Sequence, residues 1–398
     1  MLTSLAIIFL FGLVIGWIFK RLRLPNLLGM IITGILVGPY MLNLLDPSIL
    51  AISIDLRQLA LIIILTRAGL SLDLKDLKKA GHSAILMCFL PVCFEIAGVV
   101  LLAPRLLGIS ILDSLIMGAV IAAVSPAVVV PKMLNLMENG YGTDKSIPQM
   151  IMAGASVDDI FVIVIFSSAT SLAQGDAISA LSLLKIPESI LTGIIIGAVI
   201  GLALNAFFVR VHIRDSIKVV ILLSVSFLLV ALEKMDFFPF SGLLAVMALG
   251  VAIQFKRPVV AKRLSLKFSK LWVGAEVLLF VLVGATVNLE YAAAAGISAI
   301  ALIFIVMLFR MLGVYVCMLG TKLNIKERIF CMVAYMPKAT VQAAIGSIPL
   351  SLGLGCGNVV LTVAVLSILI TAPLGAFGID LLYKRTLNKE EMAQEGVL

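Results

Sequence analysis

The chain is dominated by apolar runs of about 20 residues, separated by short polar stretches. A helix of that length rises roughly 30 Å, which matches the hydrocarbon core of a bilayer. The runs lack the ten-residue alternation of a membrane β-barrel. The pattern therefore predicts an all-α integral membrane protein with thirteen spans, at residues 2–20, 26–42, 56–72, 82–103, 110–137, 147–171, 187–210, 215–234, 236–254, 266–288, 292–319, 329–349 and 358–383.

Composition and charge agree with a membrane location. Hydrophobic residues make up 62% of the chain and charged residues 13%, whereas soluble domains carry about 25% charged residues. The net charge of +8 does not indicate nucleic acid, because 23 of the 30 basic residues lie in alternate loops or in the span ends beside them, on one side of the membrane. The positive-inside rule then predicts an external N-terminus and a cytosolic C-terminus, with membrane lipids as the surroundings.

Prolines are expected to interrupt two of the predicted spans near their middles. Span 110–137 contains Pro126 and Pro131, and span 329–349 contains Pro337. Proline removes an amide donor and clashes with the carbonyl four residues earlier, so each helix should kink or break. A single proline is most simply a kink in a packed helix. The two spans, however, run in opposite directions, and each is the middle of a three-helix unit, which is typical of inverted-repeat transporters that bind substrate at the midplane.

Five ionisable residues fall near the middle of the membrane, at a depth of about 15 Å. They are Glu95, Asp158, Asp159, Arg310 and Lys338. A charge at the centre of a bilayer costs roughly 2.5 to 3.5 kcal/mol on insertion scales, so such residues normally bind an ion, carry a proton or pair with one another. The function is therefore expected within the membrane.

Glu95 and Arg310 occupy matching helices of the two units, and we expect a buried salt bridge between them. Arginine keeps its proton in proteins, so Arg310 can balance charge but cannot carry the exchanged proton. Two interpretations of Lys338, next to Pro337, stay open. It offsets the dipole of a half-helix, or it pairs directly with an acid.

Asp158 and Asp159 are the candidate ion ligands, and the metal they would bind is the transported ion. Adjacent helical positions are about 100° apart, so the two side chains point in different directions. We favour Asp159 as the ion ligand and Asp158 as the acid with a basic partner. The reverse assignment, and a simple neutralisation of both acids by Arg and Lys, stay open.

Burial and a like-charged neighbour favour the protonated acid, so a proton and a sodium ion can compete for the same oxygens. The hydroxyl groups of Ser125, Ser156 and Thr340 are candidates to complete the ion's shell. The alternative for each is a hydrogen bond to its own helix backbone.

Several stretches resemble the monovalent cation:proton antiporters, in particular the sodium/proton exchanger-domain branch that contains sodium/lithium:proton antiporters. The matching stretches are Arg67–Leu70, Ala123–Pro131, Ser156–Ile160, Pro337–Gly346 and Leu366–Pro373. The resemblance implies a homodimer without a cofactor that exchanges Na⁺ or Li⁺ for protons by elevator-type alternating access between two crossed broken helices. It also implies Asp159 as the main ion site.

The resemblance further implies a division into dimerisation and core domains. The expected parts are dimerisation helices 1–81, core unit 82–171, linker helix 172–210, scaffold helices 211–291, core unit 292–383 and a cytosolic tail 384–398. The chain departs from better-known branches, which have lysine in place of Arg310 and in some cases asparagine in place of Asp158. Because lysine can release a proton and arginine cannot, these departures leave the number of exchanged protons open.

Two other functions are alternatives for a chain of this kind. A sodium-coupled symporter of organic anions would share the inverted-repeat fold but would need an anion-binding group. A receptor or intramembrane enzyme is disfavoured, because HExxH, GxSxG and P-loop spacings are missing from the sequence. We therefore expect a transporter and not an enzyme.

Overall fold

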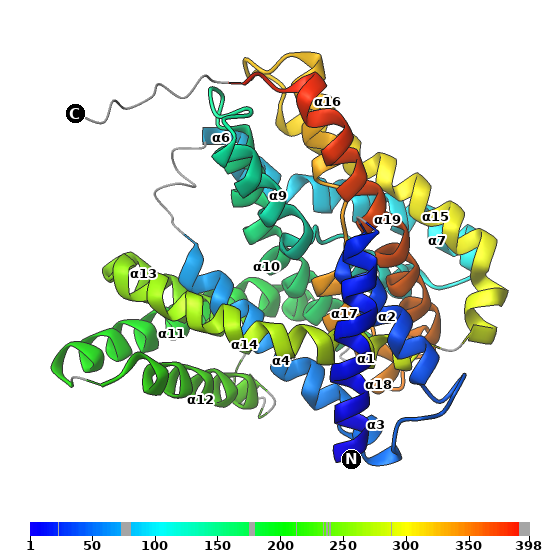
Figure 1. The fold of residues 1–398 in the computed structure, drawn as a ribbon, viewed down its shortest axis with the longest axis horizontal. Coiled ribbons are helices and arrows are strands. Elements are labelled where there is room, and N and C mark those ends of the chain that lie inside the picture. The colour runs from blue at the N-terminus through cyan, green and yellow to red at the C-terminus, as the bar shows by residue number, and fades with distance from the viewer. Residues whose placement is uncertain are drawn as a thin grey trace. The chain divides into compact units, whose positions relative to one another are not determined.

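The protein is described by a computed structural model that covers residues 1–22, 24–72, 81–174, 180–211, 213–233, 235, 238, 240–287 and 289–389. The described residues form helices and loops with one isolated antiparallel bridge, between Tyr141 and Lys389. The helices of Figure 1 are α1 (Leu2–Arg21), α2 (Asn26–Val37), α3 (Pro47–Ala51), α4 (Ser53–Ser71), α6 (Gly81–Met87), α7 (Leu90–Leu107), α8 (Ile111–Ile121), α9 (Pro126–Glu138), α10 (Ile147–Ala173), α11 (Ala180–Arg210), α12 (Asp215–Glu233), α13 (Gly242–Lys256), α14 (Pro258–Ala285), α15 (Leu289–Cys317), α16 (Ile325–Ala334), α17 (Thr340–Ile345), α18 (Ile348–Ser351) and α19 (Gly357–Thr386). The predicted all-helical fold is confirmed for these residues.

Long apolar helices account for much of the described chain. Within it, nine stretches are long and apolar enough to cross a membrane, namely Leu2–Arg21, His82–Leu107, Ile111–Glu138, Ile147–Ala173, Leu191–Arg210, Asp215–Glu233, Pro258–Ala285, Gly296–Cys317 and Gly357–Thr386. Asn26–Val37 and Gly242–Lys256 are shorter apolar helices. The predicted total of thirteen spans and the predicted orientation go beyond this observation and stay predictions.

Two helices begin well before the residue that the hydropathy pattern predicts, by about two turns. α14 starts at Pro258 instead of residue 266, and α11 starts at Ala180 instead of residue 187. Proline favours the first helical turn, and lysine and arginine are good helix formers, so the basic stretch after Pro258 is helical although it is not apolar. Hydropathy locates the part of a helix that matches the lipid, and it misses the polar turns beyond it.

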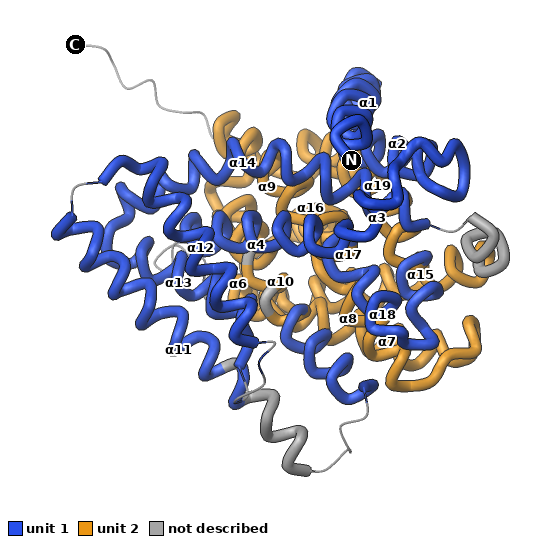
Figure 2. Tube along the Cα trace, turned by 90° about the horizontal axis from the view of Figure 1, so that it is seen from below, with its two compact units in different colours: residues 1–74, 163–294, 343–362 blue, residues 75–162, 295–342, 363–398 orange. Residues whose placement is uncertain are grey.

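The chain divides into two compact units (Figure 2). Unit 1 comprises residues 1–74, 163–294 and 343–362, and unit 2 comprises residues 75–162, 295–342 and 363–398. In unit 1, α14 packs against α2 and α4, and α13 packs against α4 and α11. A side chain at Gly34 would collide with the backbone oxygen of Val281, and one at Gly69 with that of Met247. Small residues thus allow the helices to pack closely. Such packing matters in a bilayer, because the apolar lipid supplies no hydrophobic force that drives helices together.

Unit 2 contains the prolines of both spans that are predicted to be interrupted by proline. α8 ends at Ile121, residues 122–125 are not helical, and α9 begins with Pro126 as its first residue. α9 continues through Pro131, so this proline does not end the helix, and a kink there stays a prediction. A proline inside a helix can be accommodated by a kink, whereas the missing amide of Pro126 costs nothing at a first turn.

The second interruption surrounds Pro337. α16 ends at Ala334, where Tyr335 is its C-terminal cap, and the next helix, α17, starts at Thr340. α16 begins with a capping box, in which Asn324 and Glu327 each bond to the other's backbone amide. α19 passes close to Pro337 at Gly375, where a side chain would overlap the proline ring. Both interruptions are therefore built into unit 2 by cap, proline and glycine positions.

Candidate functional site

The two interruptions of unit 2 contact each other directly. The amide of Ser125 donates a 2.7 Å hydrogen bond to the carbonyl of Pro337. Gln342 Nε2 donates to the carbonyl of Ala123 at 2.8 Å and to that of Ile121 at 3.3 Å. Residues more than 200 positions apart in the sequence thus meet where both helices lack their regular backbone hydrogen bonds. Backbone groups at these interruptions can therefore bind other partners.

Two buried cations occupy the C-terminal end of α8. Lys338 Nζ donates to the carbonyl of Ile121, and Arg310 Nη1 donates to the carbonyl of Ala122. The C-terminus of a helix is the negative end of its dipole, so positive side chains are favourable there. This half-helix end is therefore already neutralised by the protein itself.

The same two cations hold two of the acids. Arg310 Nη1 lies 2.9 Å from Glu95 Oε2, and Arg310 Nη2 lies 3.0 Å from Asp158 Oδ2. Lys338 Nζ lies 2.5 Å from Glu95 Oε1, so Lys338 contacts an acid as well as the helix end. The side chains of these four residues are at most 1% exposed. Arg310 Nε also donates to the carbonyl of Tyr335 at 2.7 Å, which fixes the guanidinium at the second interruption.

Asp158 and its neighbour differ in their surroundings. Asp158 Oδ2 accepts the amide of Val124 at 3.1 Å in addition to Arg310. Asp159 is 9% exposed and forms no ion pair with any residue that the structure describes. Within that part of the chain, Asp159 Oδ1 and Asp158 Oδ1 also lack a hydrogen-bond donor. The unpaired acid of the site is therefore Asp159.

The charges of this cluster do not cancel. Three acids (Glu95, Asp158 and Asp159) and two bases (Arg310 and Lys338) leave a net charge of −1 when all five groups are ionised. A net charge so deeply buried is costly unless it is neutralised. One bound proton or one bound monovalent cation is enough to neutralise it.

Hydroxyl groups predicted as ion ligands lie at the interruptions. Ser125 is fully buried at the start of α9 and Thr340 is 3% exposed at the start of α17. Neither hydroxyl has a hydrogen-bond partner among the described residues. The side chain of Ser156, the third predicted hydroxyl, lies outside the described part of the structure.

Gln342 is a site residue that the sequence reasoning did not single out. It is 1% exposed, and its amide ties α17 to the end of α8. A polar residue within the apolar stretch that follows Pro337 is a signal that could have identified it. Its partners, however, cannot be deduced from spacing.

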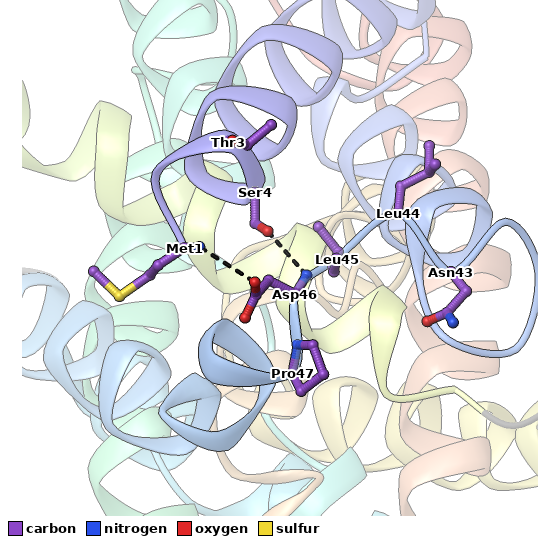
Figure 3. Close-up of a pocket in the computed structure, with 8 residues that line it drawn as sticks. All are labelled: Met1, Thr3, Ser4, Asn43, Leu44, Leu45, Asp46 and Pro47. Carbon is purple, nitrogen blue, oxygen red and sulfur yellow. Dashed lines mark hydrogen bonds and ion pairs between the residues drawn. The ribbon is translucent and has the colours of Figure 1, made fainter.

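A surface pocket of about 330 Å³ lies in unit 1, at the start of α1 (Figure 3). Its acid, Asp46, lies 3.5 Å from the amino group of Met1, and its backbone amide donates to Ser4 Oγ. Hydrogen bonds to Ser48 lower the pKa of the Asp46 carboxyl below its usual value. Because this carboxylate is exposed and already bonded, the pocket does not resemble the buried cluster of unit 2.

The described residues form several helices that are long and apolar enough to span a membrane, and buried charges lie at two interruptions that bond to each other. These features are typical of a multi-pass membrane transporter. The family model "Sodium/hydrogen exchanger, transmembrane" matches residues 5–385, and the chain belongs to this family. Human sodium/hydrogen exchanger 9B2 is 36% identical over 389 residues, covering 92% of this chain and 71% of that protein. Human sodium/hydrogen exchanger 9B1 is 32% identical over 419 residues, covering 98% of this chain and 78% of that protein.

The fold is similar to that of a solved antiporter. The structure of the sodium proton antiporter MjNhaP1 from Methanocaldococcus jannaschii at pH 8 matches with a TM-score of 0.83. The match covers 97% of this chain and 98% of that one at 18% sequence identity. At 18% sequence identity this similarity shows that the two proteins share a fold. It confirms the predicted antiporter fold and no further property.

Proposed function

We propose that the protein is a secondary antiporter that exchanges cytosolic Na⁺ or Li⁺ for external protons. The observation that carries the proposal is the unpaired, buried carboxylate of Asp159, beside an Asp158 that is already bonded to Arg310. A proton and a small cation compete for that carboxylate, and only one of them is bound at a time. The relatives are named sodium/hydrogen exchangers, which supports sodium and protons as the substrates.

The proposed exchange is one cation for one proton. The five ionised groups carry a net charge of −1, and either substrate brings the cluster to zero. Arg310 cannot release its proton, and Lys338 is held by the buried Glu95 carboxylate. Neither base is therefore assigned a second exchanged proton, so the cycle moves no net charge.

Other unpartnered oxygen atoms of unit 2 would complete the shell of the dehydrated cation in this proposal. Small alkali ions are hard cations and prefer oxygen ligands. Asp158 Oδ1, Ser125 Oγ and Thr340 Oγ1 are buried, and no described residue donates to them. We assign them as supporting ligands, with Ser156 as a further candidate on α10.

Glu95, Arg310 and Lys338 form the fixed framework of the site in this proposal. Their ion pairs hold the ends of the interrupted helices, and Pro126 and Pro337 maintain the interruptions. Breaking a buried pair would leave an uncompensated charge, so these residues position the site without being transported ligands.

Alternating access by an elevator-type movement is the proposed mechanism. All five ionisable residues belong to unit 2, so the movement of one compact unit could carry the whole site. Unit 1 would then provide the scaffold and the contact between two copies in a homodimer. The resemblance described in the sequence analysis likewise implies a mobile core at residues 82–171 and 292–383, with dimerisation and scaffold helices at residues 1–81 and 211–291.

A sodium-coupled organic-anion symporter is not favoured by the site. Such a protein needs a cation that is free to bind a carboxylate. In unit 2 the two central bases, Arg310 and Lys338, are both engaged by Glu95. The cluster has an excess of acid, which favours a positively charged substrate.

The test is proton movement in proteoliposomes that contain a pH-sensitive dye, started by adding NaCl or LiCl. Asp159→Asn should abolish the cation-dependent signal, because the amide binds neither a proton nor a cation well. Leu271→Ala, at an exposed residue of α14 in unit 1, is the control for reconstitution. Full activity of Asp159→Asn would overturn the proposal.

A further inference from the structure

Gln342 is held in one orientation by its contacts. It is the third residue of α17, and its Nε2 lies 2.8 Å from Ala123 O and 3.3 Å from Ile121 O. Backbone carbonyls only accept hydrogen bonds, so the amide nitrogen must face them. The reversed amide would place its oxygen against two other oxygens. Oε1 is therefore directed away from these two carbonyls.

The oxygen of this amide has no donor in the described part of the chain, although the residue is 1% exposed. Buried polar groups in proteins are nearly always hydrogen-bonded, so an exception needs an explanation. The amide nitrogen bonds to Ala123, and the next residue, Val124, donates to Asp158. The unpartnered Oε1 therefore belongs to a side chain that is bonded to Ala123, and the residue after Ala123 is bonded to Asp158.

Other unpartnered oxygens lie in the same two chain segments. Thr340 is two residues before Gln342, and Ser125 is two residues after Ala123. Their hydroxyl oxygens, like Asp158 Oδ1, also lack partners among the described residues. A group of oxygen atoms without donors fits a positively charged ligand that is not part of the chain.

We propose that Gln342 supplies a neutral oxygen to the transported cation and thereby helps to discriminate Na⁺ from Li⁺. The inference rests on the proposed function. Because two hydrogen bonds fix the amide, its oxygen cannot follow an ion of a different size freely. Li⁺ is smaller and completes its shell with fewer oxygens, so losing this ligand should weaken Na⁺ binding more than Li⁺ binding.

A purely structural role gives a different expectation. If the amide only ties α17 to α8, its loss would lower stability or turnover for all cations alike. The ratio of the apparent KM values for Na⁺ and Li⁺ separates the two roles. A fold defect alone does not change that ratio.

The experiment compares Gln342→Leu with the parent protein in dye-loaded proteoliposomes, titrated with NaCl and with LiCl. The expected result is a KM for Na⁺ that rises about tenfold and a KM for Li⁺ that rises less, so their ratio shifts by about threefold or more. The same shift is expected in the cation concentrations that raise the melting temperature in detergent, with choline chloride as the inert salt. Equal changes for both ions, or no change, would overturn the proposal.

Two further variants test whether the shift is specific to the Gln342 oxygen. Gln149→Leu is the matched control, because Gln149 Oε1 on α10 is also buried without a described partner but is not bonded to the α8 end. It should leave the ratio unchanged, and a comparable shift would contradict the assignment. Gln342→Asn keeps an amide but is one methylene shorter, so its oxygen is withdrawn and the ratio should shift in the same direction as in Gln342→Leu. If Gln342→Leu does not fold, a parent-like ratio in Gln342→Asn overturns the inference.

Asp159→Asn in the same assays separates this inference from the proposed function. If Asp159→Asn keeps its response to both cations, the proposed function fails. If Asp159→Asn loses that response while Gln342→Leu keeps the parent ratio, only the role of Gln342 fails.

Discussion

The guanidinium of Arg310 lies 3.0 Å from the carboxylate of Asp158, and the next residue, Asp159, has no such partner among the described residues. Two adjacent acids on α10 are thus unequal. One is part of a fixed ion-pair network, and the other is available for a proton or a cation. Because Asp159 has no cationic partner among these residues, the charges of the cluster in unit 2 do not cancel.

Removing the guanidinium should destabilise the protein. Arg310→Gln leaves Asp158 buried without its counter-ion, and breaking a buried pair typically costs about 3–5 kcal/mol. Thermal unfolding in detergent should show a clear fall in melting temperature. The double variant Arg310→Gln with Asp158→Asn restores the charge balance and should recover part of the loss. An unchanged melting temperature in Arg310→Gln would show that the network does not stabilise the fold.

Transport should not respond to membrane potential. The cluster carries −1 before binding and zero with either substrate bound, so each exchanged pair moves no net charge. In proteoliposomes clamped with potassium and valinomycin, the initial rate of exchange should be equal at zero, positive and negative potentials. A rate that follows the potential would require a second proton, with Lys338 as the first group to examine by Lys338→Gln.

Proton competition should set the pH dependence of cation affinity. Where Asp159 is mostly protonated, a cation must displace one proton, so the apparent KM for Na⁺ should rise about tenfold for each unit of falling pH. At higher pH, where the acid is already ionised, KM should become independent of pH. Sodium titrations at several pH values give this slope. A limiting slope of two decades per unit would contradict competition by a single proton.

Glu327 should contribute to stability without affecting substrate binding. Its fully buried carboxylate caps α16 and lies 2.8 Å from Lys145 Nζ. Glu327→Gln removes the charge from both contacts and should destabilise the protein by about 1–3 kcal/mol. The melting temperature should fall while the KM for Na⁺ stays constant. Lys326→Gln, at the exposed neighbouring position, is the control and should leave both unchanged.

Much of this arrangement could be predicted from the sequence. Prolines within apolar spans indicated the interruptions, and acids within such spans indicated the buried charges. The helical nature of the chain followed from the length of its apolar runs. These features depend on local chemistry and on the properties of the bilayer.

Other features depend on contacts between distant segments. The sequence could not reveal that Val124 donates to Asp158 or that Gln342 bonds to Ala123, because each pair comes from separate segments that meet only in the folded unit. The sequence predicts a kink or a break at both Pro126 and Pro131, but α9 begins at Pro126 and continues through Pro131. Local rules identify where a helix is weakened, but the surrounding structure decides where it ends.

The central claim is that one buried acid binds a proton and a cation alternately. Its most direct test is the release of protons when NaCl is added to the purified protein in weakly buffered detergent solution, at a pH where Asp159 is protonated. The account predicts close to one proton released per Na⁺ bound, and no release from Asp159→Asn. Sodium binding without proton release, or unchanged release from Asp159→Asn, would contradict it.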